Sequence, residues 1–372
     1  TSLFDIYINS SEMRSYSDLV INATHTEQKH EFNTFDRFDI IKQEAIEEDI
    51  SPFLNHIKYI WCKGDDDKYE YVLNWMAHCV QFPNIKTKVA LVLMSKPGSG
   101  KGVIVQKFSK IFGSKYYLHC NDFETILGNF NSQLEGKFLV FLDECVWGGN
   151  KKDSGKLKTF ITEETRQINK KNIPKYTVNC VANAIIASNE DWVIPAGKGA
   201  RRFLVLDLND EYSGNKSTES QEYFTRLSNV NDKAIAHFFY NRDLSSFVST
   251  KIPHSNMLQE QQTMSLGSVE SFILSLLQGD VSLQNDGIDV EMEGWHSRKN
   301  IYNSFVDYCR ENNTRIEKAP TFWTTLKKIF PYTTDKNNEK MIRGIRMKHI
   351  VNMETNRDLW TKYMNGWNWE HE

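Results

Sequence analysis

Residues 95–102, SKPGSGKG, place two glycines and a lysine in one short loop. The apolar run before the loop, residues 89–94, predicts a buried strand, and a helix is expected to begin near Gly102. Gly98 and Gly100 let backbone N–H groups approach an anion, Lys101 adds a positive charge, and the helix N-terminus favours negative charge. These features predict a loop that binds the phosphates of a nucleoside triphosphate. Its expected contact residues are Pro97, Gly98, Ser99, Gly100, Lys101, Gly102 and Val103.

The loop differs at both ends from the common phosphate-loop pattern G-x-x-x-x-G-K-[ST]. Ser95 stands where the first glycine belongs, and Gly102 stands where a Mg²⁺-binding hydroxyl belongs. Because four residues such as GSGK also occur by chance, the assignment depends on motifs elsewhere in the chain.

A second motif, FLVFLDE at residues 138–144, ends in two acidic residues. The apolar residues predict a strand, and the ligands of open α/β sheets bind at the carboxyl ends of strands. In phosphate-loop ATPases the first acid holds Mg²⁺ and the second polarises the attacking water, which are the roles expected of Asp143 and Glu144. An acidic pair after a strand is more often a solvated strand end. Its place on the next clear buried strand after Lys101 favours the catalytic role.

Polar residues also lie beside two further strands. Asn189 follows the apolar run in AIIASN and is expected to orient the lytic water, although a lone asparagine there is usually a turn residue. Arg201 and Arg202 precede the strand expected in RFLVLDL, and one of them is expected to reach the triphosphate of a neighbouring subunit. The alternative is a pair of surface arginines.

Basic residues cluster in TRQINKKNIPKYTVN, just before the Asn189 strand. Alternating apolar and polar residues predict a hairpin with Lys170, Lys171 and Lys175 near its tip. Such a cluster is usually a solvated loop. On a ring-shaped ATPase it would face the central channel and bind a nucleic-acid backbone.

The segments that must position these residues alternate between apolar strands and amphipathic helices from residue 86 to about 210. The pattern predicts an α/β fold with a mostly parallel central sheet covered on both faces. A helical unit is expected before it, and three helices followed by a hairpin predict a winged-helix-like domain after it. The expected divisions are a lead-in or linker segment at 1–49, a helical collar at 50–85, the ATPase core at 86–212, a helical extension and connector at 213–265, and the winged-helix-like domain at 266–372.

Composition narrows the class of protein. The 372 residues carry a formal net charge of −3, so any contact with nucleic acid must come from local clusters. Six scattered cysteines without a CxxC pair indicate reduced thiols in the cytoplasm and support neither a disulfide framework nor a zinc site. No apolar run approaches the roughly 20 residues that span a bilayer, so no membrane partner is expected. A first residue other than Met suggests a fragment of a longer polypeptide.

The ordered set SKPGSGKG, FLVFLDE, LKTFITEETRQINKKNIPKYTV, AIIASNEDW and GARRFLVLDL resembles superfamily 3 AAA+ helicases. More narrowly, it is similar to the helicase half of phage, plasmid and large-DNA-virus primase-helicases, and the resemblance is specific over about residues 86–210. It implies a P-loop ATPase that uses ATP and Mg²⁺ and works as a hexameric ring on single-stranded DNA and forked duplex. It also implies a primase or polymerase domain before Thr1 and action in the cytoplasm of a host cell.

The resemblance implies a role for each motif residue. Those roles are phosphate binding for Lys101, metal binding for Asp143, catalysis for Glu144, a sensor function for Asn189, and DNA contact for Lys171 and Lys175. Arg202 is preferred to Arg201 as the arginine that acts on the neighbouring subunit. Since relatives often carry a glycine after the lysine, Mg²⁺ coordination falls to Asp143, water and the phosphates, with Ser99 as a less favoured contributor.

Two alternatives stay open. The first is a DNA-dependent AAA+ ATPase that serves as a replication initiator or packaging motor without processive unwinding. The second is a non-enzymatic winged-helix protein whose candidate DNA contacts are Trp323, Lys327, Lys328, Arg343, Arg346 and Lys348. A strand-displacement assay separates the first from a helicase, and undetectable ATP hydrolysis would favour the second.

Overall fold

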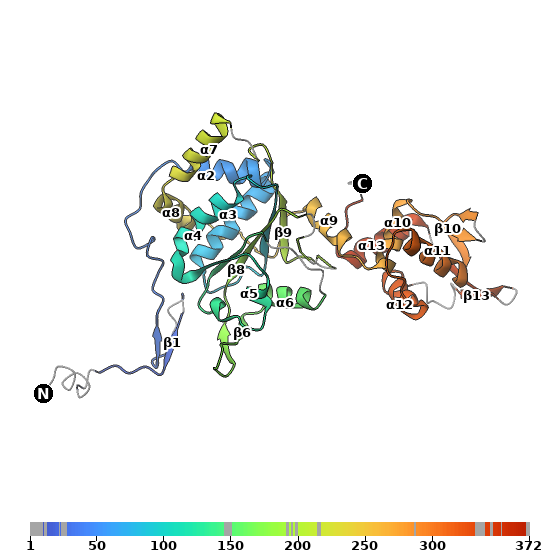
Figure 1. The fold of residues 1–372 in the computed structure, drawn as a ribbon, viewed down its shortest axis with the longest axis horizontal. Coiled ribbons are helices and arrows are strands. Elements are labelled where there is room, and N and C mark those ends of the chain that lie inside the picture. The colour runs from blue at the N-terminus through green and yellow to red at the C-terminus, as the bar shows by residue number, and fades with distance from the viewer. Residues whose placement is uncertain are drawn as a thin grey trace. The chain divides into compact units, whose positions relative to one another are not determined.

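The structure is a computed structural model, and it describes residues 10, 13–21, 23, 28–144, 151–190, 193–194, 196–197, 200–213, 217–285, 288–331, 339–342, 345–350 and 352–369. The chain divides into two units (Figure 1). The first comprises Thr1–Val193 and Arg201–His254, and the second comprises Ile194–Ala200 and Ser255–Glu372. Within the described residues, no helix is long and apolar enough to cross a membrane.

Five parallel strands form the centre of the first unit, in the order β4-β5-β8-β3-β9. They are β3 (Ala90–Met94), β4 (Tyr117–Cys120), β5 (Leu139–Leu142), β8 (Asn183–Ser188) and β9 (Phe203–Asp207). Every residue of β3, β5 and β8 is buried, as expected for strands covered on both faces. The α/β fold with a parallel central sheet is therefore confirmed.

Helices cover one face of this sheet. Because side chains alternate between the two faces of a strand, Leu91 and Leu93 of β3 lie on the same face. They share a core with buried residues of three helices, which are α3 (Asp66–Gln81), α4 (Lys101–Tyr116) and α8 (Asp232–Asn241). The remaining helical segments on this side in Figure 1 are α2 (Ser51–Asn55), the π-helix η1 (His56–Trp61) and α7 (Thr218–Asn229).

The helices differ in how they begin. Side chains of Asp65, Ser217 and Asn231 accept hydrogen bonds from backbone N–H groups in the first turns of α3, α7 and α8. Helix α4 instead begins after Gly100, which has no side chain that could cap it. The N–H groups at the start of α4 are thus left without a side-chain cap.

An insertion between β5 and β8 carries the predicted hairpin. Helix α6 (Lys151–Thr162) leads into β6 (Thr165–Ile168), which pairs antiparallel with β7 (Tyr176–Asn179). Figure 1 shows this hairpin projecting from the body of the first unit. Two short helical segments lie in the loop before β5, namely α5 (Glu124–Leu127) and η2 (Ser132–Leu134).

The segment predicted as a lead-in or linker contributes to the core. After a two-stranded parallel sheet of β1 (Asp18–Val20) and β2 (Glu31–Asn33), the chain buries Phe35 and Phe38. The ring centroid of Phe35 lies 5.1 Å from that of Phe138, and both phenylalanines belong to the core that lies against α4. Part of the segment 1–49 is thereby integral to the first unit.

The second unit has a core of its own. Buried Phe272, Phe305, Phe322 and Trp360 lie at its centre. Its helices are α9 (Asn256–Met264), α10 (Ser268–Gln278), α11 (Arg298–Glu311), α12 (Ala319–Ile329) and α13 (Met353–Met364). Its strands are β10 (Leu283–Asn285), β11 (Ile288–Val290), β12 (Gly294–Ser297), β13 (Glu339–Ile342) and β14 (Ile345–Ile350).

The chain order α10, β12, α11, α12, β13, β14 contains the expected three helices and hairpin, and β12, β14 and β13 form one antiparallel sheet in that order. Helix α9, expected in the connector, is part of this unit. The side chains of Arg343, Arg346 and Lys348 lie outside the described part of the chain. A DNA-binding role for this unit stays a prediction.

Candidate functional site

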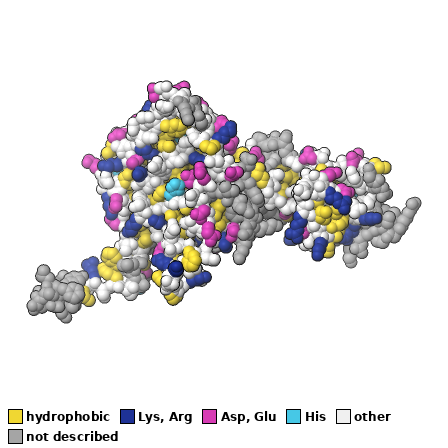
Figure 2. Space-filling view, viewed as in Figure 1, with side chains coloured by type: hydrophobic (Ala, Val, Ile, Leu, Met, Phe, Trp, Pro, Cys, Tyr) yellow, Lys and Arg dark blue, Asp and Glu magenta, His cyan; other side chains and the backbone are white. Residues whose placement is uncertain are grey.

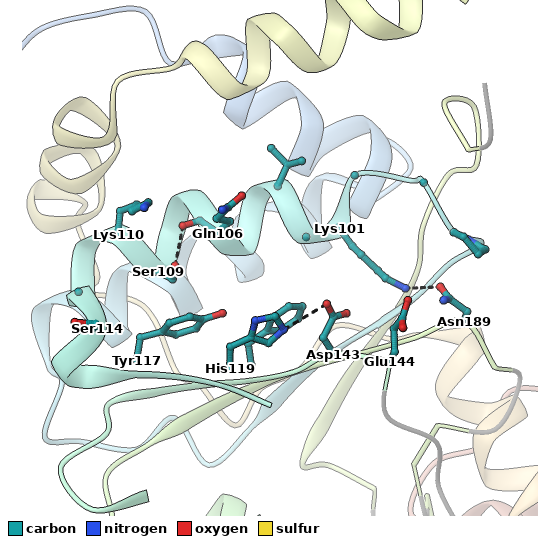
Figure 3. A pocket seen from close by; sticks show the side chains of 17 residues that line it. Lys101, Gln106, Ser109, Lys110, Ser114, Tyr117, His119, Asp143, Glu144 and Asn189 are labelled. Carbon is teal, nitrogen blue, oxygen red and sulfur yellow. Dashed lines mark hydrogen bonds and ion pairs between the residues drawn. The ribbon is translucent and has the colours of Figure 1, made fainter. Parts of the chain in front are cut away.

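Three strand ends meet at one cleft of the first unit. The loop after β3, the two acids after β5 and Asn189 after β8 share the carboxyl edge of the parallel sheet. The cleft has a volume of about 720 Å³ and lies between α4 and the sheet (Figure 3). It is lined by nine of the predicted residues, namely Pro97, Gly98, Gly100, Lys101, Gly102, Val103, Asp143, Glu144 and Asn189.

Two glycines shape the loop at one end of the cleft. Gly98 and Gly100 have φ values of 86° and 84°, a region that residues with a Cβ rarely adopt. A Cβ on Gly100 would also lie 2.6 Å from both His56 Cε1 and Phe224 Cε1. Gly102 is different, because a Cβ there would meet no atom within 4 Å. Packing therefore requires glycine at position 100. At position 102, where the common pattern has a hydroxyl residue, there is room for a side chain.

Ser99 is turned away from the cleft. Its hydroxyl donates a hydrogen bond of 2.7 Å to the hydroxyl of Ser95, and the residue is 1% exposed. Ser95, which replaces the first glycine of the common pattern, therefore stabilises the loop by accepting this hydrogen bond. This contact argues against Ser99 as a metal ligand, since its oxygen is buried and already bonded.

Lys101 extends along the cleft to the end of β8. Its Nζ donates a hydrogen bond to Asn189 Oδ1, as Figure 3 shows. Burial lowers the pKa of the Lys101 ammonium group, and the nearby carboxylates of Asp143 and Glu144 oppose that shift. The partner of the lysine is thus a neutral amide oxygen, so an anion in the cleft would meet a cation that is not paired with a carboxylate of any described residue.

The two acidic residues have different surroundings. Asp143 is partly buried, and its backbone N–H donates a hydrogen bond of 2.8 Å to the Cys120 carbonyl. Glu144 is exposed and has a φ of 53°, an uncommon value for a residue with a side chain, and such strain is concentrated at functional sites. Among the described residues, no three His, Cys, Asp or Glu side chains form a group that could hold a metal ion. A metal bound at Asp143 would need oxygen ligands from phosphate or water.

His119 is a cleft residue that the sequence did not predict. Its Nε2 lies 3.5 Å from Asp143 Oδ2, and its ring stacks on Phe141 with a centroid distance of 5.1 Å. Tyr117, two residues earlier on β4, also lines the cleft. The only available signal was alternation in YYLHC, which is too short to predict a strand or its facing side chains.

His56 lies directly behind the phosphate-binding loop. It is 0% exposed, its Nδ1 is 2.8 Å from the Tyr223 hydroxyl, and its Nε2 is buried without a hydrogen-bond partner in the described structure. Desolvation lowers the pKa of His56 to about 3. The imidazole therefore stays neutral in the folded protein at physiological pH.

Acidification is expected to destabilise the protein through His56. In the unfolded chain its pKa is about 6.5, so below that pH the unfolded state binds a proton that the folded state does not. Between pH 7 and pH 5 the free energy of unfolding should fall by about 2 kcal/mol from this group alone. Urea unfolding of wild type and His56→Gln at both pH values measures the effect, and the exposed His30→Gln serves as the control. Equal pH dependence in wild type and His56→Gln would contradict the prediction.

The two arginines lie at the opposite edge of the sheet. Pairing of Ala90 with Phe203 and of Met94 with Asp207 puts Arg201 and Arg202 at the amino ends of strands, whereas Lys101 follows a carboxyl end. A strand of this length spans about 16 Å, and neither arginine lines the cleft. Arg201 is exposed, and Arg202 is half-buried.

Arg202 has an incomplete set of partners. Its Nε is buried and forms no hydrogen bond within the described structure. Its charge also contributes to the lowered pKa of Lys158, for which burial is the larger cause. A buried donor without a hydrogen-bond partner next to a second cation is energetically unfavourable.

The three predicted lysines of the β6–β7 hairpin differ in whether their charge is paired. Lys170 is paired within the chain, because its Nζ lies 2.5 Å from Glu135 Oε2. Lys171 and Lys175 are exposed at the tip and form no ion pair with another described residue. Figure 2 shows basic and hydrophobic side chains together at this end of the unit. The hairpin thus offers two uncompensated positive charges and one that is neutralised.

Two exposed apolar residues accompany these lysines. Ile173 lies between them at the tip and is 51% exposed. Phe130, which the sequence did not single out, is 66% exposed on the loop after α5. This loop is bound to the hairpin, since Asn131 Nδ2 donates to Gln167 O at 3.0 Å and Asn169 Nδ2 donates to Asn129 O at 2.7 Å. Long-range pairing of this kind has no signature in the sequence.

The fold and the cleft define a mixed α/β protein with a glycine–lysine loop at the carboxyl edge of a five-stranded parallel sheet. Residues 93–202 match a protein family described as a family of unknown function (DUF5906). The chain is similar to the DNA primase-polymerase of Nitratiruptor phage NrS-1, with 33% identity over 162 residues. The matched part is 42% of this chain and 22% of that relative. The resemblance to a phage primase-polymerase that the motifs indicated is therefore confirmed.

A solved structure extends the similarity of the fold beyond the matched sequence. The apo structure of the C-terminal region of NrS-1 aligns with a TM-score of 0.65 and 22% identity, covering 86% of this chain and 80% of that one. At this identity the match establishes the fold.

Proposed function

We propose that this chain is an ATP-driven motor that moves along single-stranded DNA as a ring and separates the duplex ahead of it. One observation carries the proposal. Between Glu144 and Asn189, two residues of the same cleft, the chain passes through a hairpin whose tip exposes Lys171 and Lys175. A basic tip is therefore built on the segment that joins two residues expected to respond to ATP.

The cleft fits a Mg²⁺-bound triphosphate. The first turn of α4 has no side-chain cap, Gly98 and Gly100 hold the loop open to an anion, and Lys101 forms no ion pair with a carboxylate in the described part of the chain. When bound, Mg²⁺ would neutralise charge on the phosphates, with Asp143 as its protein ligand. Glu144 would orient the attacking water. Asn189 would exchange its bond with Lys101 for contacts at the terminal phosphate.

Completion of this site requires a second subunit. Among the described residues, no arginine lines the cleft, and charge that develops on the transferred phosphoryl group is commonly stabilised by one. Arg201 and Arg202 lie at the opposite edge of the sheet, where they would face the cleft of a neighbour in a head-to-tail ring. A hexamer is the ring size that the family resemblance implies.

DNA would bind at the hairpin. A net charge of −3 excludes attraction by the whole molecule, so the contact must be local. Lys171 and Lys175 would hold phosphates, and the exposed faces of Ile173 and Phe130 would contact sugars and bases.

Removal of the two uncompensated charges tests the proposal. In Lys171→Ala/Lys175→Ala, single-stranded DNA affinity is expected to fall about tenfold and the slope of log affinity against log salt to decrease by about 1.5. Strand displacement on a forked duplex should be lost. Lys170→Ala is the matched control, because Lys170 is already paired with Glu135 and its loss should change affinity by less than about twofold.

Other outcomes would replace the proposal. ATP hydrolysis that DNA stimulates without strand displacement would indicate an initiator or packaging motor. Undetectable hydrolysis in the presence of DNA would indicate a non-enzymatic DNA-binding protein. Equal losses of affinity in the double variant and in Lys170→Ala would show that the hairpin tip is not the contact.

A further inference from the structure

Lys86 is a buried cation that the proposed reaction does not use. It is 4% exposed, and it forms no ion pair with a carboxylate in the described part of the chain. Its Nζ donates a hydrogen bond to the Phe160 carbonyl, lies 3.8 Å from Cys180 Sγ, and lies 5.1 Å from the centroid of the Phe160 ring. Burial lowers the pKa of this ammonium group. A buried charge without a carboxylate partner is costly, so its presence calls for a role.

The partners of Lys86 lie at the two ends of the β6–β7 hairpin. Phe160 lies in the last turn of α6, just before the chain enters β6, and Cys180 follows the last residue of β7. The two ends are also joined directly, because Cys180 N donates to Glu164 O at 2.7 Å. A cation at the carboxyl end of a helix is favourably placed for the helix dipole. Lys86 thus holds the hairpin at its root.

Thr87 and Lys88, which follow Lys86, also contact residues next to the hairpin. Thr87 donates to Asn183 Oδ1 from its backbone N at 2.9 Å and from its hydroxyl at 2.8 Å, and Asn183 is the first residue of β8. Lys88 Nζ lies 3.1 Å from Glu164 Oε1, but both side chains are largely exposed. Of the two lysine contacts to the hairpin root, the Lys86 contact is therefore the one protected from water, where hydrogen bonds are strongest.

Residues 86–88 also lead directly into the cleft. They precede β3, whose carboxyl end becomes the phosphate-binding loop, and β3 pairs with β8, which ends at Asn189. A displacement of β3 relative to α6 would be transmitted to the hairpin through a short, buried contact. Without Lys86, the remaining lysine contact to the hairpin root is the exposed pair of Lys88 and Glu164, which is weak in water.

We propose that Lys86 is a positioning residue that couples the ATP site to the hairpin by tying the segment just before β3 to both ends of the β6–β7 hairpin. The inference rests on the proposed function. It adds that hydrolysis and DNA contact are linked through the root of the hairpin, at a residue that touches neither ATP nor DNA.

Lys86→Met tests the coupling, because methionine keeps the apolar stem against Phe160 and removes the donor. Basal ATP hydrolysis and DNA affinity are expected to stay within about twofold of wild type, whereas the stimulation of hydrolysis by single-stranded DNA should fall about tenfold. Lys86→Arg should restore it. The matched control is Lys137→Met, since Lys137 also donates to carbonyls at the end of a helix, Ser114 and Lys115 of α4, but does not touch the hairpin.

Full stimulation in Lys86→Met, or a parallel loss of basal activity, DNA affinity and thermal stability, would overturn the inference. Hydrogen–deuterium exchange gives a second measurement on the wild type without DNA. An ATP analogue should change the protection of residues 165–179, and unchanged protection would overturn the coupling even if the variant does not fold. Absence of DNA-stimulated hydrolysis in the wild type would instead contradict the proposed function.

Discussion

Lys101→Ala should reduce ATP hydrolysis by about a hundredfold to a thousandfold while the protein stays folded. Lys101 is the cation at the end of the cleft where Asp143, Glu144 and Asn189 converge. Its removal leaves developing negative charge on the phosphates without its main protein partner. The loss should appear chiefly in kcat, because transition-state charge is greater than ground-state charge. Steady-state phosphate release with single-stranded DNA present measures the effect.

The matched control for this variant lies on the same helix. Lys110 also lines the cleft but is exposed at its far end, beyond Gln106, so Lys110→Ala should retain most of the activity. Burial already disfavours the charge of Lys101, so its removal should change the midpoint of thermal unfolding little. Retention of hydrolysis and strand displacement by Lys101→Ala would rule out the assignment of this cleft as the ATP site.

Two inactive variants should restore activity when they are mixed. Arg202→Ala is expected to lower hydrolysis by about a thousandfold, as for other arginines supplied by a neighbouring subunit. In a mixed ring, the intact cleft of an Arg202→Ala subunit can face the intact arginine of a Lys101→Ala subunit. Random mixing creates such an interface at roughly one position in four, so about a quarter of the wild-type rate should return. Hydrolysis by each protein alone and by the mixture measures this.

The Arg201→Ala variant shows which of the two arginines acts on the neighbouring subunit. If Arg202 is the acting residue, as its unpartnered buried Nε suggests, Arg201→Ala should lose less activity. A reversed order would transfer the role to Arg201. No recovery in the mixture, together with a mass that stays that of a monomer in the presence of ATP analogue and DNA, would contradict the shared site.

The parts of the structure that follow from local rules were predictable. Continuous apolar runs identified β3, β5, β8 and β9, because strands buried on both faces need no alternation. The glycines at positions 98 and 100 indicated a loop whose backbone can approach an anion, and the positive φ of both residues fits this role. Since parallel strands place their carboxyl ends at one edge, the sequence also predicted that Lys101, Asp143 and Asn189 would meet there.

What could not be predicted depends on contacts between distant residues. The ion pair of Lys170 with Glu135 joins residues 35 positions apart in the chain. Because of this pair, the charge of Lys170 is compensated, unlike the charges of Lys171 and Lys175. The hydrogen bond between the hydroxyls of Ser99 and Ser95 depends on the conformation of the loop, which the sequence pattern does not specify. The packing of Phe35 against Phe138 is set by tertiary structure, so the weak periodicity of the lead-in or linker segment at 1–49 does not indicate which of its residues are buried.

The two ends of the β6–β7 hairpin are joined by a hydrogen bond, so the hairpin can change in evolution independently of the sheet. Because Cys180 N donates a hydrogen bond to Glu164 O, the fifteen residues between them start and end at one place. Residues can be gained, lost or exchanged at the hairpin tip without shifting the register of β5 or β8, since surface insertions cost little closure entropy. Selection can therefore change the residues at the tip while the residues that line the cleft are inherited unchanged.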